Sequence, residues 1–334
     1  MTTNNPGGLE AARDAIVGRQ RFLITSHARP DGDSIGSQLA MAFALDALGK
    51  TSRIVNADPA PAHYASFPGM DRIEIASSVE GDYDALIVME CGDLRRPGVA
   101  GLDGYFTINI DHHLGNTGYG DVNWFDETAA ACTELVFPLI ESLGVTPGEA
   151  IGTHVYLGIL TDTGSFHHGF MTERTFAISR ACVAAGVDAA AMARQVFDSS
   201  SIGKLRLIGS ILEGMQLEAG GRVAVLRLTP EMLQSTGSTT DDTEGLINLP
   251  LTAKEIEAVI MFKSGEREAG EAAGADTRVS LRSKGTVDVR GVATHYGGGG
   301  HKNAAGLTLT PPSDAAERDV IARVVAAVQH ADTR

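Results

Sequence analysis

Residues that bind metal ions or transfer protons gather in one short stretch near the start of the chain, ITSHARPDGDSIGS (24–37). His27, Asp31 and Asp33 lie within seven residues there. Imidazole nitrogen combined with carboxylate oxygen suits Mn²⁺ or a related divalent ion better than Ca²⁺, which prefers oxygen ligands alone. A polar turn with an Asx cap would also account for this stretch taken alone, so its meaning depends on the rest of the chain.

Similar side chains follow three further apolar runs. They are Glu90 and Asp93 after ALIVM, Asp111, His112 and His113 after YFTINI, and Asp162 after VYLGIL. Ligands of open α/β sheets bind beyond the carboxyl ends of the strands, so we expect these residues to meet at one sheet edge. They are too many for a single ion. A carboxylate that bridges two ions holds them about 3.5–4 Å apart, the spacing used for in-line displacement at phosphorus.

The second half of the chain carries a different signal, the run GGGGHKNAAG (297–306). Consecutive glycines are unfavourable in helices and strands, but they let backbone N–H groups approach an anion. The candidate anion-binding residues are Gly298, Gly299, Gly300 and His301, together with Arg282, Ser283 and Lys284 of SLRSKG. A flexible hinge is the alternative, and the apolar strand GLTLT that follows directly argues against it.

The elements that must position these residues alternate in type. Strand-like segments occupy 21–26, 52–57, 84–90 and 105–111, and helix-like segments occupy 34–49, 128–144 and 172–186. This alternation predicts an α/β fold, with an N-terminal, mostly parallel sheet that has helices on both faces.

A second, smaller α/β domain is predicted at the C-terminus. Its strands are expected at 222–229, 255–265 and 277–285, its helices at 287–296 and 314–331, and a hairpin loop at 265–277. The predicted boundaries are 1–195 for the metal-binding domain, 196–220 for a helical connector and 221–334 for the substrate-binding domain.

Composition excludes several classes of protein. The 334 residues suffice for two buried cores, and they contain no run of about 18 apolar residues. The N-terminus lacks the pattern of a signal peptide, and the three cysteines form no CxxC pair, so we expect a cytoplasmic protein without membrane contact. The net charge of −15 argues against binding of long duplex DNA, whereas a small anionic substrate remains compatible. A solvated acidic surface accounts for most of the excess charge.

The segments SHARPDGDSIGS, NIDHHLGN, GILTDTGSF and GGGGHKNAAG resemble the motifs of DHH-family phosphoesterases that carry the DHH-associated C-terminal domain. The similarity is greatest to the branch of oligoribonucleases and pAp phosphatases, the nanoRNases, and it runs in order over about residues 10–330.

The resemblance implies a dinuclear, usually Mn²⁺, centre. One ion would be held by His27, Asp31 and Glu90, and the other by Asp33, Glu90, His112 and Asp162. Members of the family commonly have Asp where Glu90 stands, so Asp93 is the alternative bridge. His113 would orient the phosphate or protonate the leaving oxygen, and Asp111 would orient a ligand histidine.

The expected activity is the hydrolysis of short single-stranded RNA, of pAp, or of both to mononucleotides, by a hydroxide that bridges the two metals. A cyclic di-AMP or pApA phosphodiesterase is the nearest alternative. A RecJ-like exonuclease, an inorganic pyrophosphatase and a nucleotide sensor without turnover are less favoured. The sequence also leaves a homodimer open.

Overall fold

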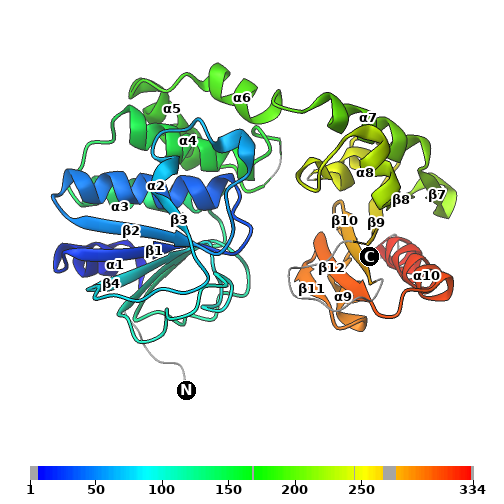
Figure 1. Ribbon diagram of the computed structural model, residues 1–334, viewed down its shortest axis with the longest axis horizontal. Coiled ribbons are helices and arrows are strands. Elements are labelled where there is room, and N and C mark those ends of the chain that lie inside the picture. The colour runs from blue at the N-terminus through cyan, green and yellow to red at the C-terminus, as the bar shows by residue number, and fades with distance from the viewer. Residues whose placement is uncertain (1–6, 168, 244, 266–275, 332–334) are drawn as a thin grey trace. The chain divides into compact units, whose positions relative to one another are not determined.

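The structure, a computed structural model, describes residues 7–167, 169–243, 245–265 and 276–331. The chain forms two compact units, Met1–Ser199 and Ser200–Arg334 (Figure 1). Most of the hairpin loop expected at 265–277 lies outside the described residues.

The first unit is built on a parallel sheet of six strands in the order β3-β2-β1-β4-β5-β6. The strands are β1 (Arg21–Thr25), β2 (Thr51–Asn56), β3 (Ile73–Ile75), β4 (Ala85–Met89), β5 (Thr107–Asp111) and β6 (Val122–Phe125). The predicted α/β class and the parallel sheet are confirmed. Because the chain adds strands first on one side of β1 and then on the other, the order reverses between β1 and β4. Such a switch point is where α/β sheets bind ligands.

Side chains of this sheet alternate between two cores. Ile24 and Ile87 face one core, whereas Leu23 and Leu86 face the other, as the period of a strand requires. The helices that contribute to the first core are α1 (Gly8–Val17), α2 (Gly32–Ala47), α3 (Thr133–Ser142), α4 (Glu149–Asp162), α5 (Glu173–Ala184) and α6 (Ala189–Phe197).

The second core of this unit is covered by irregular segments that contribute Val79 and Val99. The described helices therefore gather on one face of the sheet, whereas the sequence pattern predicts helices on both. Glycine and proline recur through 92–104, and both residues disfavour a helix there.

The sequence pattern predicts that the run VYLGIL is a strand that ends before Asp162, and this prediction is wrong. It lies inside α4, whose last residue is Asp162. A short apolar run does not distinguish a buried strand from a helix that is buried on most sides, and α4 is such a helix, with Ile159 fully buried and Leu160 1% exposed.

Among the described residues, no single helix combines the length and apolarity needed to cross a membrane. The helices α5 and α6 meet these criteria only as a pair bent by 106°.

The second unit contains another sheet of six strands, in the order β11-β12-β10-β9-β8-β7. Its strands are β7 (Gln216–Glu218), β8 (Val223–Leu228), β9 (Ala258–Ser264), β10 (Thr277–Ser283), β11 (Gly299–His301) and β12 (Ala304–Leu309). All neighbours are antiparallel except β8 and β9. The expected strands at 222–229, 255–265 and 277–285 correspond to β8, β9 and β10.

Helices cover both faces of the second sheet. One core contains residues of α9 (Arg290–His295) and α10 (Asp314–Ala331), which correspond to the helices expected at 287–296 and 314–331. The other core contains residues of α7 (Ile202–Glu213) and partly buried residues of α8 (Pro230–Thr236). The segment 196–220 thus includes α7 and β7, and α7 packs on the sheet through Leu207 and Ile211.

Helices α2 and α4 approach closely because glycines lie at their contact. A Cβ on Gly36 of α2 would overlap with the carbonyl oxygen of His154 in α4. A Cβ on Gly32 would overlap with the side chain of Thr161. The absence of these Cβ atoms lets α2, which begins with residues of the opening motif, lie against α4, which ends with Asp162.

We expect Gly36→Ala to destabilise the first unit by about 1–3 kcal/mol, since the added methyl group overpacks a buried backbone contact. The matched control is Gly209→Ala on α7, where a Cβ would meet nothing within 4 Å. There, higher helix propensity should stabilise the protein by about 0.5–1 kcal/mol. Calorimetric unfolding checks both variants, and equal behaviour would contradict the packing argument.

Candidate metal centre

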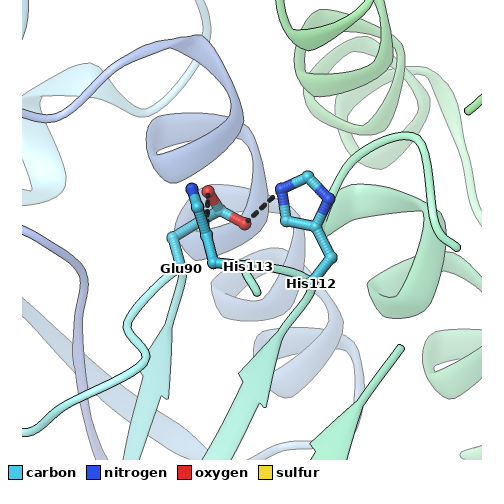
Figure 2. A group of neighbouring side chains, drawn as sticks. All are labelled: Glu90, His112 and His113. Atoms are coloured by element: carbon cyan, nitrogen blue, oxygen red, sulfur yellow. Dashed lines mark ion pairs between the residues drawn. The ribbon is translucent and has the colours of Figure 1, made fainter. Parts of the chain in front are cut away.

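Glu90 lies at the switch point of the first sheet, directly after β4. Its side chain is 1% exposed, and its backbone N–H donates to the Ile110 carbonyl of β5. Glu90 Oε1 lies 3.4 Å from His112 Nε2, and Oε2 lies 3.6 Å from His113 Nδ1. Figure 2 shows the carboxylate between the two rings. This carboxylate therefore reaches both histidines that follow β5.

His112 presents a ring nitrogen to the same space. Its Nδ1 donates to the Ala129 carbonyl over 3.0 Å, so in the neutral ring Nε2 carries a lone pair. That Nε2 and Glu90 Oε1 are buried, and neither has a hydrogen-bond partner among the described residues. Two facing acceptors without a donor are unfavourable, and a cation between them would satisfy both. The donor set thus fits a divalent metal ion.

Asp33 is held by the N-terminus of α3. Its Oδ2 accepts a hydrogen bond from Cys132 N over 2.5 Å, and its Oδ1 accepts one from Thr133 N over 3.1 Å. The positive end of the helix dipole favours a carboxylate at this position. Asp33 Oδ2 lies 4.0 Å from His112 Nε2, which also lies 3.5 Å from Asp162 Oδ2.

His27 and Asp31 form the next group, where β1 passes into α2. Asp31 is the N-cap of α2 and accepts from Ser34 N. Its Oδ2 lies 3.6 Å from His27 Nε2. The His27 Nδ1 donates to the Ala28 carbonyl, so in the neutral ring Nε2 faces Asp31 as an acceptor. Burial alone would raise the pKa of Asp31. The hydrogen bond and charge of His27 in its protonated form, together with the Ser34 amide, instead lower it to about 2.

Crowding of negative charge dominates the electrostatics of the centre. Burial, followed by the charges of Asp33 and Asp31, raises the pKa of Glu90 well above its ordinary value. Burial and the charge of Asp33 raise the pKa of Asp162 to about 7. A bound cation would relieve this repulsion.

Three groups of side chains can each hold a metal ion, because their ligand atoms lie within 4.8 Å of one another. The groups are His27, Asp31 and Glu90, then Asp33, His112 and Asp162, and lastly Glu90, His112 and His113. The sequence-based ligand residues therefore come together, with Glu90 and His112 each present in two groups.

Asp93, the alternative bridge, does not belong to any of these groups in the described part of the chain. Its carboxylate instead accepts two hydrogen bonds from the Arg95 side chain, over 2.8 and 2.7 Å. These bonds lower the pKa of Asp93 to about 2.

Asp111 contacts His113, the histidine that belongs only to the third group. Its Oδ1 lies 2.9 Å from His113 Nδ1, and its Oδ2 accepts from Asn116 Nδ2 over 2.6 Å. The sequence predicts that Asp111 orients a ligand histidine. Asp111 contacts His113, a member of the third group, whereas His112 is oriented by the Ala129 carbonyl. Burial alone would raise the pKa of Asp111, yet the bond and charge of His113 lower it. Asp111 and His113 thus form a carboxylate–imidazole pair.

Arg282 and His301 lie in one row of the second sheet. Both pair with Ala304 of β12, Arg282 from β10 and His301 from β11. The only hydrogen bond found for the Arg282 guanidinium, among the described residues, goes to its neighbour's carbonyl, that of Leu281. Burial without a carboxylate partner lowers the pKa of Arg282. Such a cation is suited to bind an anion.

Ser283 and Lys284, which are also expected to bind substrate, have hydrogen-bond partners within the second unit. Ser283 Oγ donates to the Val287 carbonyl, and Lys284 Nζ donates to the Ala253 carbonyl. A Cβ on Gly298 or Gly300 would overlap with backbone oxygens of β12, whereas one on Gly299 would meet nothing within 4 Å. We expected the glycine run to disfavour a strand, but it forms the edge strand β11. Two of its glycines serve the close approach to β12.

Sequence reasoning missed the segment 126–134, which contacts the candidate ligands His112 and Asp33 through Ala129, Cys132 and Thr133. Those contacts use backbone atoms, which leave no signature in residue type. Glu134 is the buried charged residue of this segment. In the sequence it resembles any acidic residue in the first turn of a helix.

Comparison with known proteins identifies both parts of the chain. Residues 21–159 match the DHH family, N-terminal domain, and residues 220–329 match the DHHA1 domain. A Thermus thermophilus protein named bifunctional oligoribonuclease and PAP phosphatase NrnA is 34% identical over 289 residues, which cover 86% of this chain and 84% of the relative. A Bacillus subtilis protein of the same name is 25% identical and covers 86% and 89%.

Solved structures agree on the fold. An exopolyphosphatase-related protein from Bacteroides fragilis superposes with a TM-score of 0.85 at 25% identity, covering 95% of this chain and 96% of that one. The exonuclease RecJ bound to manganese has a TM-score of 0.58 at 15% identity, covering 96% and 94%.

We expect Mn²⁺ to raise the melting temperature of protein freed of metal by EDTA, because binding to the folded state stabilises it by about 2.7 kcal/mol at 100 times Kd. Glu90→Gln should lose most of this shift, since it removes a charge from two ligand groups. Asp93→Asn is the matched control and should keep the shift. Differential scanning fluorimetry checks this, and the reverse pattern would contradict the role of Glu90.

Proposed function

Because the chain belongs to the DHH family, with a DHHA1 domain in its C-terminal part, we propose that it is a metal-dependent phosphoesterase. Its substrates are short oligoribonucleotides and pAp, which it hydrolyses to mononucleotides. Relatives named oligoribonuclease and PAP phosphatase over most of their length support this activity. The observation that carries the proposal is the facing pair of buried acceptors, Glu90 Oε1 and His112 Nε2, between carboxylate groups.

The proposed cofactor is a pair of divalent ions, most suitably Mn²⁺. His27, Asp31 and Glu90 would hold one ion, and Asp33, His112 and Asp162 the other, with Glu90 shared between them. The mixture of imidazole and carboxylate ligands supports Mn²⁺ over Ca²⁺. Such a pair, when bound, lowers the pKa of a water molecule and neutralises charge on the reacting phosphoryl group.

The protein's own groups handle the leaving oxygen. We assign its protonation to His113, because a carboxylate on Nδ1 keeps a histidine oriented and stabilises its protonated form. Asp111 supplies that carboxylate, and Asn116 holds Asp111 in turn. His113 also lies within 3.6 Å of Glu90 Oε2, which places it beside the ligand groups without an essential part in either of the first two.

The second unit would bind a further phosphate or the nucleotide end of the substrate. Arg282 and His301 flank Ala304 on the two neighbouring strands. A charge-assisted hydrogen bond to phosphate contributes about 1.5–3 kcal/mol. The net charge of −15 supports a short anionic substrate over a long polyanion.

The three cysteines are buried and unpaired. Free thiols are typical of a reducing compartment, and we propose a cytoplasmic location on this ground.

We expect Asp33→Ala and His112→Ala to reduce hydrolysis to background, because each removes a ligand of the same proposed ion. The assay compares pAp, short RNA, short DNA, pApA and cyclic di-AMP in Mn²⁺, and short RNA and pAp should be cleaved fastest. Unfolding in EDTA should change little. Turnover close to wild type in either variant would contradict the metal assignment, and preference for cyclic di-AMP or pApA would redirect the substrate assignment.

Arg282→Ala and His301→Ala should each raise KM about tenfold or more and leave kcat nearly unchanged, because they weaken binding away from the reacting bond. Arg278→Ala, on the same face of β10, is the matched control and should change KM little. Steady-state kinetics on pAp and short RNA check this. Unchanged KM on every substrate would remove the proposed anchor.

A further inference from the structure

The segment 126–134, which runs from the end of β6 into the first turn of α3, orients two candidate ligand side chains that it does not itself carry. The Ala129 carbonyl accepts from His112 Nδ1 over 3.0 Å. The amides of Cys132 and Thr133 donate to the carboxylate of Asp33. His112 follows β5 and Asp33 lies on α2, so one segment sets the geometry between two separate elements.

Glu134, the last residue of this segment, binds the backbone of Ala130 inside it. Its side chain is fully buried. Its Oε2 accepts from Ala130 N over 3.0 Å, next to the carbonyl that contacts His112, and also from Thr175 Oγ1 over 3.0 Å. Its Oε1 accepts from Arg174 Nε. The carboxylate therefore ties the backbone of the segment to α5.

Arg174 connects both ends of the segment. Its Nε donates to Glu134, and its Nη1 donates over 3.0 Å to Oδ2 of Asp126, which follows β6. Asp126 Oδ1 in turn accepts from the backbone and hydroxyl of Thr128. One planar guanidinium thus spans 126–134, which a flexible ammonium does not reproduce.

We propose that Glu134 and Arg174 are positioning residues of the metal centre, which act through segment 126–134 on His112 and Asp33; this inference rests on the metal site of the proposed function. Among the described residues, Glu134 is absent from all three metal-binding groups, and the guanidinium of Arg174 has no acceptor with which to bind a metal ion. Partners that orient metal ligands typically contribute 10–100-fold to metal affinity.

Stability alone is a weak explanation for this pair. Only Glu134 is fully buried, since the Arg174 side chain is 42% exposed. An ion pair with a solvent-exposed partner contributes little net stability, whereas removal of Arg174 would leave the buried carboxylate without its cation. The pair does maintain hydrogen bonds with a defined direction. The three groups that hydrogen-bond to Glu134 all act as donors. A carboxylate accepts from all of them, whereas the NH₂ group of an amide would face a donor.

The test is direct measurement of Mn²⁺ affinity by titration calorimetry on the full, EDTA-treated chain. The variants are Glu134→Gln, Arg174→Lys and the double variant Glu134→Leu with Arg174→Leu, which removes both charges together. We expect Mn²⁺ affinity to fall about 10–100-fold in each. Saturating Mn²⁺ should restore much of kcat, and the double variant in EDTA should melt close to wild type.

The matched control is Arg53→Lys. Arg53 of β2 likewise makes two charge-assisted hydrogen bonds, both to Glu74 of β3. Within the described part of the chain its other hydrogen bonds go to Glu80 and Tyr83, which are not candidate ligands. It should keep wild-type Mn²⁺ affinity.

Wild-type affinity in the variants, or failure of every variant to fold, would overturn the positioning role and leave the proposed function intact. Absence of Mn²⁺ binding by the wild-type chain would overturn the metal centre itself, and this inference with it.

Discussion

The first unit depends on one constraint, the burial of carboxylates beside one another. Glu90 and Asp33 are each 1% exposed, and Asp33 and Asp162 face the same histidine nitrogen. Like charges in such a site repel strongly. The fold offsets this with fixed dipoles, since α3 directs backbone N–H groups at Asp33 and α2 directs one at Asp31. These dipoles stabilise negative charge only in part, so the arrangement is one that a divalent cation completes.

Much of this centre could be predicted from the sequence, because parallel strands end at the same edge of a sheet. His27, Glu90 and His112 follow β1, β4 and β5, which are adjacent. Asp162 reached the same place for a different reason. Its apolar run is helical, and the C-terminus of α4 lies against α2 through glycine contacts. Composition identified the residue, whereas the type of its element depended on burial that the sequence does not reveal.

The supporting contacts could not be predicted, because they join residues distant in the chain through backbone atoms. Glu134 and Arg174 are 40 residues apart, and the Ala129 carbonyl carries no side-chain signal. The glycine run had a clear signal in the sequence, but that signal had two possible causes. Its composition suggested a ligand loop, yet Gly298 and Gly300 are also required by the passage of β11 along β12. A residue type can thus serve two constraints at once, and only the tertiary contacts separate them.

The backbone of the candidate centre is strained in a way that only the tertiary structure explains. Glu90 has a φ of +62°, in the left-handed region that side chains with a Cβ disfavour. Arg29, Ser165 and Phe166 share this conformation, close to His27, Asp31 and Asp162. Each such residue costs on the order of 1 kcal/mol. The buried sheet can bear this cost. The Glu90 side chain lies beside His112 and His113, whereas continued strand geometry would direct it to one face of the sheet. Local propensity opposes the geometry of the centre, so the fold around it, and not the motif alone, determines where the carboxylate lies.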